Sequence, residues 1–262
     1  MRIAAAILAG GKASRLGGIR KGLLPTATDG PLVQRLMGQL AAAGIGAVIL
    51  AGGDAQAYAP FARTIVADLH PGSGPLGGVE AALSHLAPRY DAVLLLPCDL
   101  PNISAEEITV LLRAHAQAPD RVVMAETAEG SHPLCAVVPI AALAEVSAAV
   151  AAGRYGVGRL WRTLGAVAVR IHDCSRLVNI NTPADLDRWR QTMLQDATSK
   201  SSPLPLGEGQ GVRARRRLEH GLVRVPAARP HPSPLPEGEG TQERGPTKTG
   251  LSPCGTQEAA DV

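Results

Sequence analysis

Through its first 196 residues, the chain alternates short apolar runs with longer stretches in which apolar residues recur at helical spacing. Each run is short enough for a buried strand, and the intervening stretches are long enough for helices. We expect strands at 3–8, 47–51, 64–67, 92–96, 121–125, 134–138 and 166–171, and helices at 31–43, 74–86, 104–115, 141–152, 157–164 and 182–193. Such alternation is typical of a mostly parallel sheet with helices on both faces. The sequence therefore predicts an α/β fold, a three-layer α/β/α sandwich, as a single domain over 1–196.

Two of the expected helices carry recognisable signals at their first residues. Gly74-Pro75 opens the helix at 74–86, where proline suits the first turn. Ser104 is an N-cap candidate for the helix at 104–115, and Glu107 three residues later completes a capping box.

The composition changes at the end of this domain. The segment 197–262 holds nine prolines, nine glycines and no aromatic residue. Such a segment buries too little apolar surface to offset the entropy lost on ordering. We predict that 197–262 is a disordered tail rich in proline and glycine, and that it takes no part in the fold.

The overall composition excludes several classes of protein. The net charge of +3 is too small to indicate a nucleic-acid partner, and no stretch approaches the roughly 20 apolar residues of a membrane span. The start of the chain lacks a signal-peptide cleavage pattern. The four cysteines form no CxxC pair, which favours free thiols in a reducing compartment. We expect a cytoplasmic protein that is a monomer or weak oligomer.

A glycine-rich basic loop follows the first expected strand. Leu8-Ala9-Gly10-Gly11 ends the apolar run, and Arg15 and Lys21 bring positive charge. Glycines permit a close approach of backbone amides to a ligand, so the loop is a candidate phosphate cradle. The alternative is a plain connection between a strand and a helix.

Two carboxylates follow expected strands at the edge where such sheets bind ligands. Asp99 lies between Pro97 and Pro101, where it is well placed to hold Mg²⁺ together with substrate phosphates. The alternative is that Asp99 caps the next turn. Asp68 follows the third strand, and either joins Asp99, contacts a nucleotide or faces water. Cys98 lacks an identifiable partner base and is interpreted as a buried structural thiol.

The ordered set of motifs resembles a known family. Residues 8–23 are similar to the signature loop of sugar-phosphate-type nucleotidyltransferases and, more closely, of molybdenum cofactor guanylyltransferases. Residues 74–78, 97–101, 132–133 and 179–186 match the same family in order and roughly in spacing. The resemblance covers about 3–190 and implies a Rossmann-like sandwich. It also implies transfer of GMP from GTP to the molybdenum–molybdopterin cofactor, with release of pyrophosphate and use of Mg²⁺.

The resemblance also assigns roles to individual residues. It implies nucleotide contacts at Leu8, Ala9, Gly10, Gly11, Lys21, Asp68 and Asp99, a Mg²⁺ ligand at Asp99, charge neutralisation at the phosphates by Arg15, and pterin contacts at His132, Asn179 and Asn181. Arg15, Lys21 and Asp99 would be the catalytic set, and GTP and molybdopterin the substrates. Proteins that deliver the cofactor or mature molybdoenzymes are compatible partners. Thr182 and Pro183 are also suited to begin a helix, which leaves both asparagine side chains available.

Two positions depart from the family pattern. Arg20 stands directly before Lys21, where the family often has an acidic residue, and 50–54 lacks the asparagine that commonly contacts the nucleotide. Gly10-Gly11 favours guanine, because relatives that transfer cytidylate usually have Ala-Gly there. The alternatives are a cytidylyltransferase on the same cofactor, another nucleotidyltransferase of the sugar-phosphate type, and a catalytically weak nucleotide-binding regulatory protein.

Overall fold

The computed structural model describes residues 1–10, 20–26, 30–62 and 64–200, with side chains to 192. The predictions made for Gly11 and Arg15 therefore lie outside the described residues. The predicted tail at 197–262 also lies outside them, except for the backbone of 197–200. The helix α7 (Pro183–Lys200) continues past the expected helix end at 193. None of the helices in the described ranges is long and apolar enough to cross a membrane.

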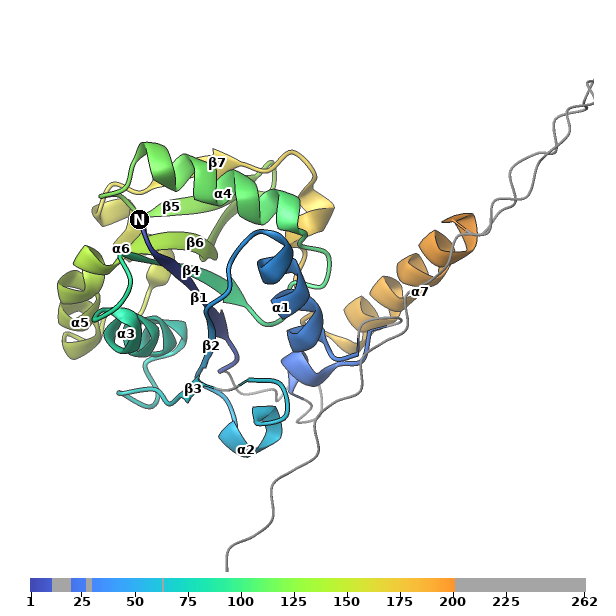
Figure 1. The fold of residues 1–262 in the computed structure, drawn as a ribbon, viewed down its shortest axis with the longest axis horizontal. Coiled ribbons are helices and arrows are strands. Elements are labelled where there is room, and N and C mark those ends of the chain that lie inside the picture. Colours follow the sequence, from blue (N-terminus) through green and yellow to red (C-terminus); the bar gives the residue numbers. More distant parts are fainter. Residues whose placement is uncertain (11–19, 27–29, 63, 201–262) are drawn as a thin grey trace, which may run out of the picture. The chain divides into compact units, whose positions relative to one another are not determined.

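The described strands form one seven-stranded sheet, in the order β3-β2-β1-β4-β6-β5-β7 (Figure 1). Their bounds are β1 (Ile3–Leu8), β2 (Val48–Ala51), β3 (Ile65–Val66), β4 (Ala92–Pro97), β5 (Val123–Thr127), β6 (Gly130–Pro139) and β7 (Val167–Arg170). Every neighbouring pair is parallel except those that β6 makes with β4 and β5. The prediction of a mostly parallel sheet is confirmed, and β6 is its one antiparallel strand within the described residues.

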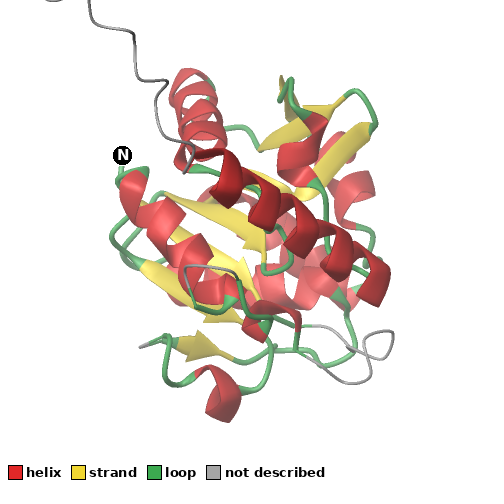
Figure 2. Ribbon diagram, turned by 90° about the vertical axis from the view of Figure 1, so that its right-hand side faces the viewer, coloured by secondary structure: helices red, strands yellow, loops and turns green. Residues whose placement is uncertain are grey.

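Helices cover both faces of this sheet, as the two orthogonal views show (Figures 1 and 2). One face packs against α3 (Pro75–Leu86), α5 (Leu143–Ala151) and α6 (Val157–Thr163), and the other against α1 (Leu32–Ala42) and α4 (Ala105–Gln117). The alternation along β1 explains this, because Ala4, Ala6 and Leu8 face the first set while Ala5 and Ile7 face the second. The three-layer sandwich is confirmed.

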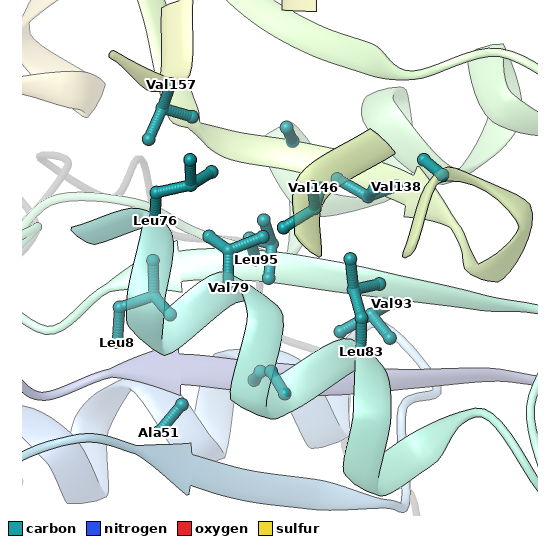
Figure 3. Packing of buried hydrophobic residues seen from close by; sticks show 14 of the residues in the cluster. Leu8, Ala51, Leu76, Val79, Leu83, Val93, Leu95, Val138, Val146 and Val157 are labelled. Atoms are coloured by element: carbon teal, nitrogen blue, oxygen red, sulfur yellow. The ribbon is translucent and has the colours of Figure 1, made fainter. Parts of the chain in front are cut away.

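The stripe along α3 shows how the first face is filled. Leu76, Val79 and Leu83 lie over Val93 and Leu95 of the central strand β4 (Figure 3). All five side chains are fully buried. Burying each is worth about 1.5–3 kcal/mol relative to leaving it exposed. The apolar spacing in the sequence is therefore what attaches α3, and the loop before it, to the sheet.

The local signals at helix starts are also confirmed. The amide of Ser104 donates to the Glu107 carboxylate at 2.9 Å, and the two form a complete capping box at α4. Gly74 precedes α3 with a φ of +61°, a conformation that glycine adopts at little cost, and Pro75 begins the helix.

Two elements differ from the sequence prediction. The four-residue helix α2 (Ala55–Tyr58) was not expected, and it begins where the Asp54 side chain accepts a hydrogen bond from the Ala57 amide. Strand β6 starts at Gly130 rather than 134, because its first residues pair with the end of β5 in a hairpin. Both features depend on contacts that periodicity does not report. Three short 3-10 helices, η2 (Lys21–Leu23), η3 (Ile140–Ala142) and η4 (Cys174–Leu177), complete the described elements.

Candidate functional site

The candidate site lies where the neighbouring strands β1 and β4 end. Leu8 and Pro97 are register partners in this parallel pair, and the amide of Cys98 donates to the Leu8 carbonyl at 3.1 Å. The glycine loop and Asp99 therefore leave the sheet side by side. This edge carries the carboxyl ends of the parallel strands, where open α/β sheets bind their ligands.

Lys21 and Asp99 meet at this edge. The Lys21 ammonium group donates to the Asp99 carboxylate at 2.8 Å and to the Asn181 side-chain oxygen at 2.7 Å. The Asn179 amide donates to the second oxygen of Asp99 at 3.0 Å. These residues form the Lys21–Asp99 cluster: Lys21, Asp99, Asn179 and Asn181. Four residues that were singled out for ligand contacts in the sequence thus share one hydrogen-bonded network.

Partial burial gives the Lys21–Asp99 pair more weight than a surface ion pair. The exposed fractions of the two side chains are 25% and 12%. Charges that are partly removed from water interact more strongly than fully exposed charges, whose pairing is worth about 0–1 kcal/mol. The Asp99 carboxylate accepts hydrogen bonds from Lys21 and Asn179, and the Asp99 backbone carbonyl accepts one from the Ile180 amide at 3.0 Å. The side chain is therefore committed to the cluster rather than to capping the turn that follows.

The start of α7 presents the two asparagines. The Asp185 carboxylate accepts from the backbone amides of Asn181 and Thr182, at 3.1 and 2.9 Å, and the Asp185 amide donates to the Thr182 hydroxyl at 3.2 Å. The Thr182 hydroxyl and these amides lower the pKa of Asp185. The cap uses backbone groups of the asparagine segment and, as predicted, does not use the side chains of Asn179 and Asn181. These side chains extend to the cluster instead, which the sequence did not predict.

The segment that carries Lys21 packs closely against two other elements. A Cβ atom placed on Gly22 would lie 2.7 Å from the Tyr58 hydroxyl oxygen and 3.3 Å from Cβ of Cys98. No larger residue fits there without movement of its neighbours. Arg20, on the other side of Lys21, forms an ion pair with Asp54.

Asp68 lies in a second part of the site, surrounded by glycines. Cβ atoms on Gly52 and Gly78 would lie 3.1 and 3.5 Å from one carboxylate oxygen of Asp68. Gly52 has a φ of +72° and its Cβ would also lie 3.0 Å from Cα of Gly10, so a side chain is disfavoured for two reasons. Glycine at these positions allows the loops after β1 and β2 and the start of α3 to converge on Asp68.

One oxygen of Asp68 is buried and has no hydrogen-bond partner among the described residues. Burial raises the pKa of this carboxyl. Whether Asp68 acts together with Asp99, contacts a nucleotide or faces water stays a prediction. A buried acceptor without a donor is costly, which fits a group that a ligand would satisfy.

The loop after Asp68 is held to α3 by an internal network. The His70 ring nitrogen Nδ1 lies 2.8 Å from the buried carboxylate of Glu80, and the Ser73 hydroxyl donates to the His70 carbonyl at 2.8 Å. These contacts fix the loop that connects Asp68 to the Gly74–Pro75 helix start.

His132 and Cys98 have the surroundings of structural residues. His132 Nε2 lies 3.2 Å from the Thr127 hydroxyl, across the β5–β6 hairpin. Burial lowers the pKa of His132, and Glu129 opposes that effect. Burial, followed by the charge of Asp99, raises the pKa of Cys98 to about 12, so its thiol is not a ready nucleophile. Cys98 is the buried thiol expected, and a pterin contact at His132 stays a prediction.

The ion pair between Arg20 and Asp54 was not predicted from the sequence, where Arg20 and the lack of an asparagine in 50–54 stood only as departures from the family pattern. Aspartate is a favoured N-cap residue, so Asp54 could have marked the start of α2, but no local signal identified Arg20 as its partner. The predicted contacts at Leu8, Ala9 and Gly10 lie at the end of β1, with the Ala9 amide donating to the Ala51 carbonyl at 2.9 Å. Their role toward a nucleotide stays a prediction.

The residues present suit a hard divalent cation. The described residues contain no group of three or more His, Cys, Asp or Glu side chains placed to hold a metal ion. Asp99 offers carboxylate oxygens, and the asparagines beside it offer amide oxygens. Mg²⁺ binds typically through one or two carboxylates plus substrate phosphates rather than through an all-protein cage. The donor set therefore fits Mg²⁺ bound together with a nucleotide.

Comparison with known proteins decides the family. The model of the MobA-like NTP transferase domain matches residues 5–168. The chain belongs to this family. It is thus a nucleotidyltransferase, and the resemblance inferred from its motifs is confirmed.

Individual proteins resemble this chain in sequence or in fold. The chain is 34% identical over 179 residues to the molybdenum cofactor guanylyltransferase of Pseudomonas fluorescens, covering 68% of this chain and 88% of that protein. Among solved structures, it resembles the molybdopterin-guanine dinucleotide biosynthesis protein A of Archaeoglobus fulgidus, with a TM-score of 0.61, 20% identity and coverage of 73% and 99%. It also resembles Rv0371C of Mycobacterium tuberculosis, solved as a complex with manganese, with a TM-score of 0.55, 18% identity and coverage of 73% and 100%. The two structures support the Rossmann-like fold.

Proposed function

We propose that this protein transfers GMP from GTP to the molybdenum–molybdopterin cofactor, forming the molybdopterin guanine dinucleotide and pyrophosphate. The observation that carries the proposal is the Lys21–Asp99 cluster at the carboxyl edge of the sheet, in a chain 34% identical to a molybdenum cofactor guanylyltransferase. The cluster combines a cation for phosphates, a carboxylate for a metal ion and amide groups for a second substrate.

The chemistry of the transfer explains why these residue types are needed. An oxygen of the pterin phosphate forms a bond to the α-phosphorus of GTP, while the bond from that phosphorus to the bridging oxygen breaks and pyrophosphate leaves. Both reactants are anionic, so the site must bring negative charges together and stabilise further charge on the leaving group. This requires cations and positioning, and no protein nucleophile. The raised pKa of Cys98 is consistent with that requirement.

Lys21 is suited to bind the phosphates of GTP, with Arg15 as a further cation in the same loop. Asp99 would hold Mg²⁺, which when bound neutralises phosphate charge and orients the reacting groups. The Lys21 ammonium group donates to the Asp99 carboxylate at 2.8 Å, so it would hold the carboxylate in place before substrate arrives.

The two substrates would occupy neighbouring parts of the edge. Leu8, Ala9, Gly10 and Gly11 would approach the nucleotide through their backbones, with Asp68 as the acceptor whose buried oxygen lacks a donor. Asn179 and Asn181 would face the pterin substrate from the start of α7, and His132 from β6. The reaction would take place in the cytoplasm, where the free thiols of Cys98, Cys135 and Cys174 stay reduced.

The decisive experiment supplies purified protein with Mg²⁺, the molybdenum-loaded pterin cofactor and either GTP or CTP. We expect the guanine dinucleotide and pyrophosphate to form with GTP alone. Turnover with CTP alone would replace this proposal by a cytidylyltransferase. Turnover with a sugar phosphate in place of the pterin would indicate a different nucleotidyltransferase, and no turnover with any nucleotide would indicate a binding protein.

A further inference from the structure

Arg20, the residue immediately before Lys21, is tied to the start of α2. Its guanidinium group pairs with the Asp54 carboxylate, 34 residues away in the sequence. Asp54 is itself held in place, because its other oxygen accepts from the Ala57 amide at 3.1 Å as the N-cap of α2. The Arg20 side chain therefore reaches a carboxylate with a fixed position.

Gly22, the residue immediately after Lys21, rests on the other end of the same helix. Its Cα faces Tyr58, the last residue of α2, so closely that an added Cβ would lie 2.7 Å from the Tyr58 hydroxyl oxygen. Tyr58 is almost fully buried. The two neighbours of Lys21 thus contact the first and last parts of α2, while the Lys21 side chain extends to Asp99 and Asn181.

The helix α2 is in turn anchored to the strands that form the site. A Cβ on Gly53, just before α2, would lie 2.9 Å from the Ala9 carbonyl oxygen and 3.2 Å from the Tyr58 ring. The Gly52 amide donates to the Val66 carbonyl of β3 at 2.8 Å. Because α2 is held against the ends of β1 and β3, it provides a stable reference for the backbone at Lys21.

We propose that α2 is a positioning platform for Lys21, and that the Arg20–Asp54 pair is a positioning pair that prepares Lys21 to bind the triphosphate of GTP. The inference rests on the function proposed above. A lysine side chain loses much rotamer freedom when it binds, so a site that holds its backbone in place before binding lowers that cost. The exposed fractions of the Arg20 and Asp54 side chains are 46% and 39%. Such an exposed pair adds little to folding stability, so its loss should appear in ligand binding instead.

A different role for Arg20 makes the opposite prediction. In that alternative, Arg20 binds a phosphate of GTP directly, and Asp54 pairs with Arg20 only while GTP is absent. Removal of the Asp54 charge would then free Arg20 and tighten GTP binding. In a positioning pair, loss of either charge weakens GTP binding, and loss of both weakens it no further. The sign of the Asp54 effect therefore separates the two roles.

The test compares the full-length wild type with Arg20→Gln, Asp54→Asn, the double variant and Arg20→Lys. Asp54→Asn keeps an oxygen to cap α2 and removes only the charge. Titration calorimetry with GTP and Mg²⁺ gives Kd, steady-state kinetics give KM and kcat, and thermal unfolding gives Tm. Arg2→Gln is the control, because Arg2 forms an exposed ion pair with Asp91 at the amino ends of β1 and β4, away from the site.

We expect Kd and KM for GTP to rise about two- to fivefold in each single variant and equally in the double variant, with little change in kcat or Tm. Arg20→Lys should stay near the wild type, as should Arg2→Gln. Tighter binding by Asp54→Asn, or unchanged binding in all variants, would overturn this inference alone. A wild type that does not bind GTP would overturn the proposed function and the inference with it.

Discussion

The ammonium nitrogen of Lys21 lies 2.8 Å from a carboxylate oxygen of Asp99, although 78 residues separate them in the chain. Asn181 joins the same ammonium group from a further 82 residues beyond Asp99. Three loops that follow different strands therefore meet at one ion pair, in which the charges of Lys21 and Asp99 balance each other. The consequence is that substitutions in any of these loops should affect a common step.

Replacing Asp99 by asparagine should reduce guanylyl transfer by about 100-fold or more, because the cluster loses the charge that pairs with Lys21 and holds the metal ion. The side chain keeps its shape, so the Tm should change little. Transfer assays with a Mg²⁺ titration and thermal unfolding check both points. Asp91→Asn, at the opposite end of β4, is the matched control and should retain activity. Near-normal transfer by Asp99→Asn would contradict the metal assignment.

Asn179→Asp should shift the acid limb of the pH profile of kcat/KM to higher pH. The new carboxylate would lie where the Asn179 amide now stands 3.0 Å from Asp99, and two like charges at that separation raise the pKa of one of them. The pair of carboxylates then takes up its first proton at a higher pH as the pH falls, and part of the negative charge available to a metal ion is lost there. Asn179→Ala provides the neutral comparison. An unshifted acid limb would show that the two groups are not coupled.

Gly22→Ala should destabilise the fold by about 1–3 kcal/mol, as expected for overpacking, and should also raise KM for GTP. The reason is the 2.7 Å contact that its Cβ would make with the Tyr58 hydroxyl oxygen. Tyr58→Phe removes that oxygen, so the double variant should recover part of the loss. Chemical denaturation of the two single variants and the double variant measures the coupling. If the two losses of unfolding free energy simply added in the double variant, the Tyr58 hydroxyl oxygen would not be the atom that clashes with the added Cβ.

The free energy of unfolding should fall as the pH drops below about 6.5, in part because of His115. This side chain is fully buried, and burial lowers its pKa despite the opposing influence of Arg121 and Asp120. The unfolded chain therefore binds a proton at a pH where the folded chain does not. The contribution of neutral His115 to the free energy of unfolding is fully present above pH 6.5 and is lost as the pH falls below it. Denaturation at several pH values should show a shallower fall for His115→Leu than for the exposed-site control His172→Gln. Equal slopes would contradict the prediction.

We expect the packing of α7 to be needed for the stability of the fold and the segment 197–262 to be dispensable. Trp189 is buried, and its indole nitrogen donates to Asn102 at 2.9 Å. Trp189→Ala should cost about 3–5 kcal/mol of unfolding free energy. A chain shortened to residues 1–196 keeps this contact, and we expect it to fold and react like the full chain. A large loss of Tm or of activity on shortening would show that 197–262 has a role.

Much of the fold could be predicted because the deciding signals are short-range. The spacing of Leu76, Val79 and Leu83 reports the buried face of α3, and Ser104 with Glu107 caps α4 within a single turn. The position of Asp99 after a strand also followed from the sequence, since strand ends are marked by the change from apolar residues to proline and aspartate. These features depend on residues a few positions apart, so the chain alone specifies them.

The pairings within the site depend on which strands are neighbours and on how their loops turn, and periodicity carries no such information. The place of β6 between β4 and β5, the contact of Lys21 with Asp99, and the pairing of Arg20 with Asp54 all arise this way. Each contact joins segments brought together by burial of the two sheet faces, a property of the whole assembled core rather than of any local stretch. The motifs identified the residues that take part, and the packed sheet selected their partners.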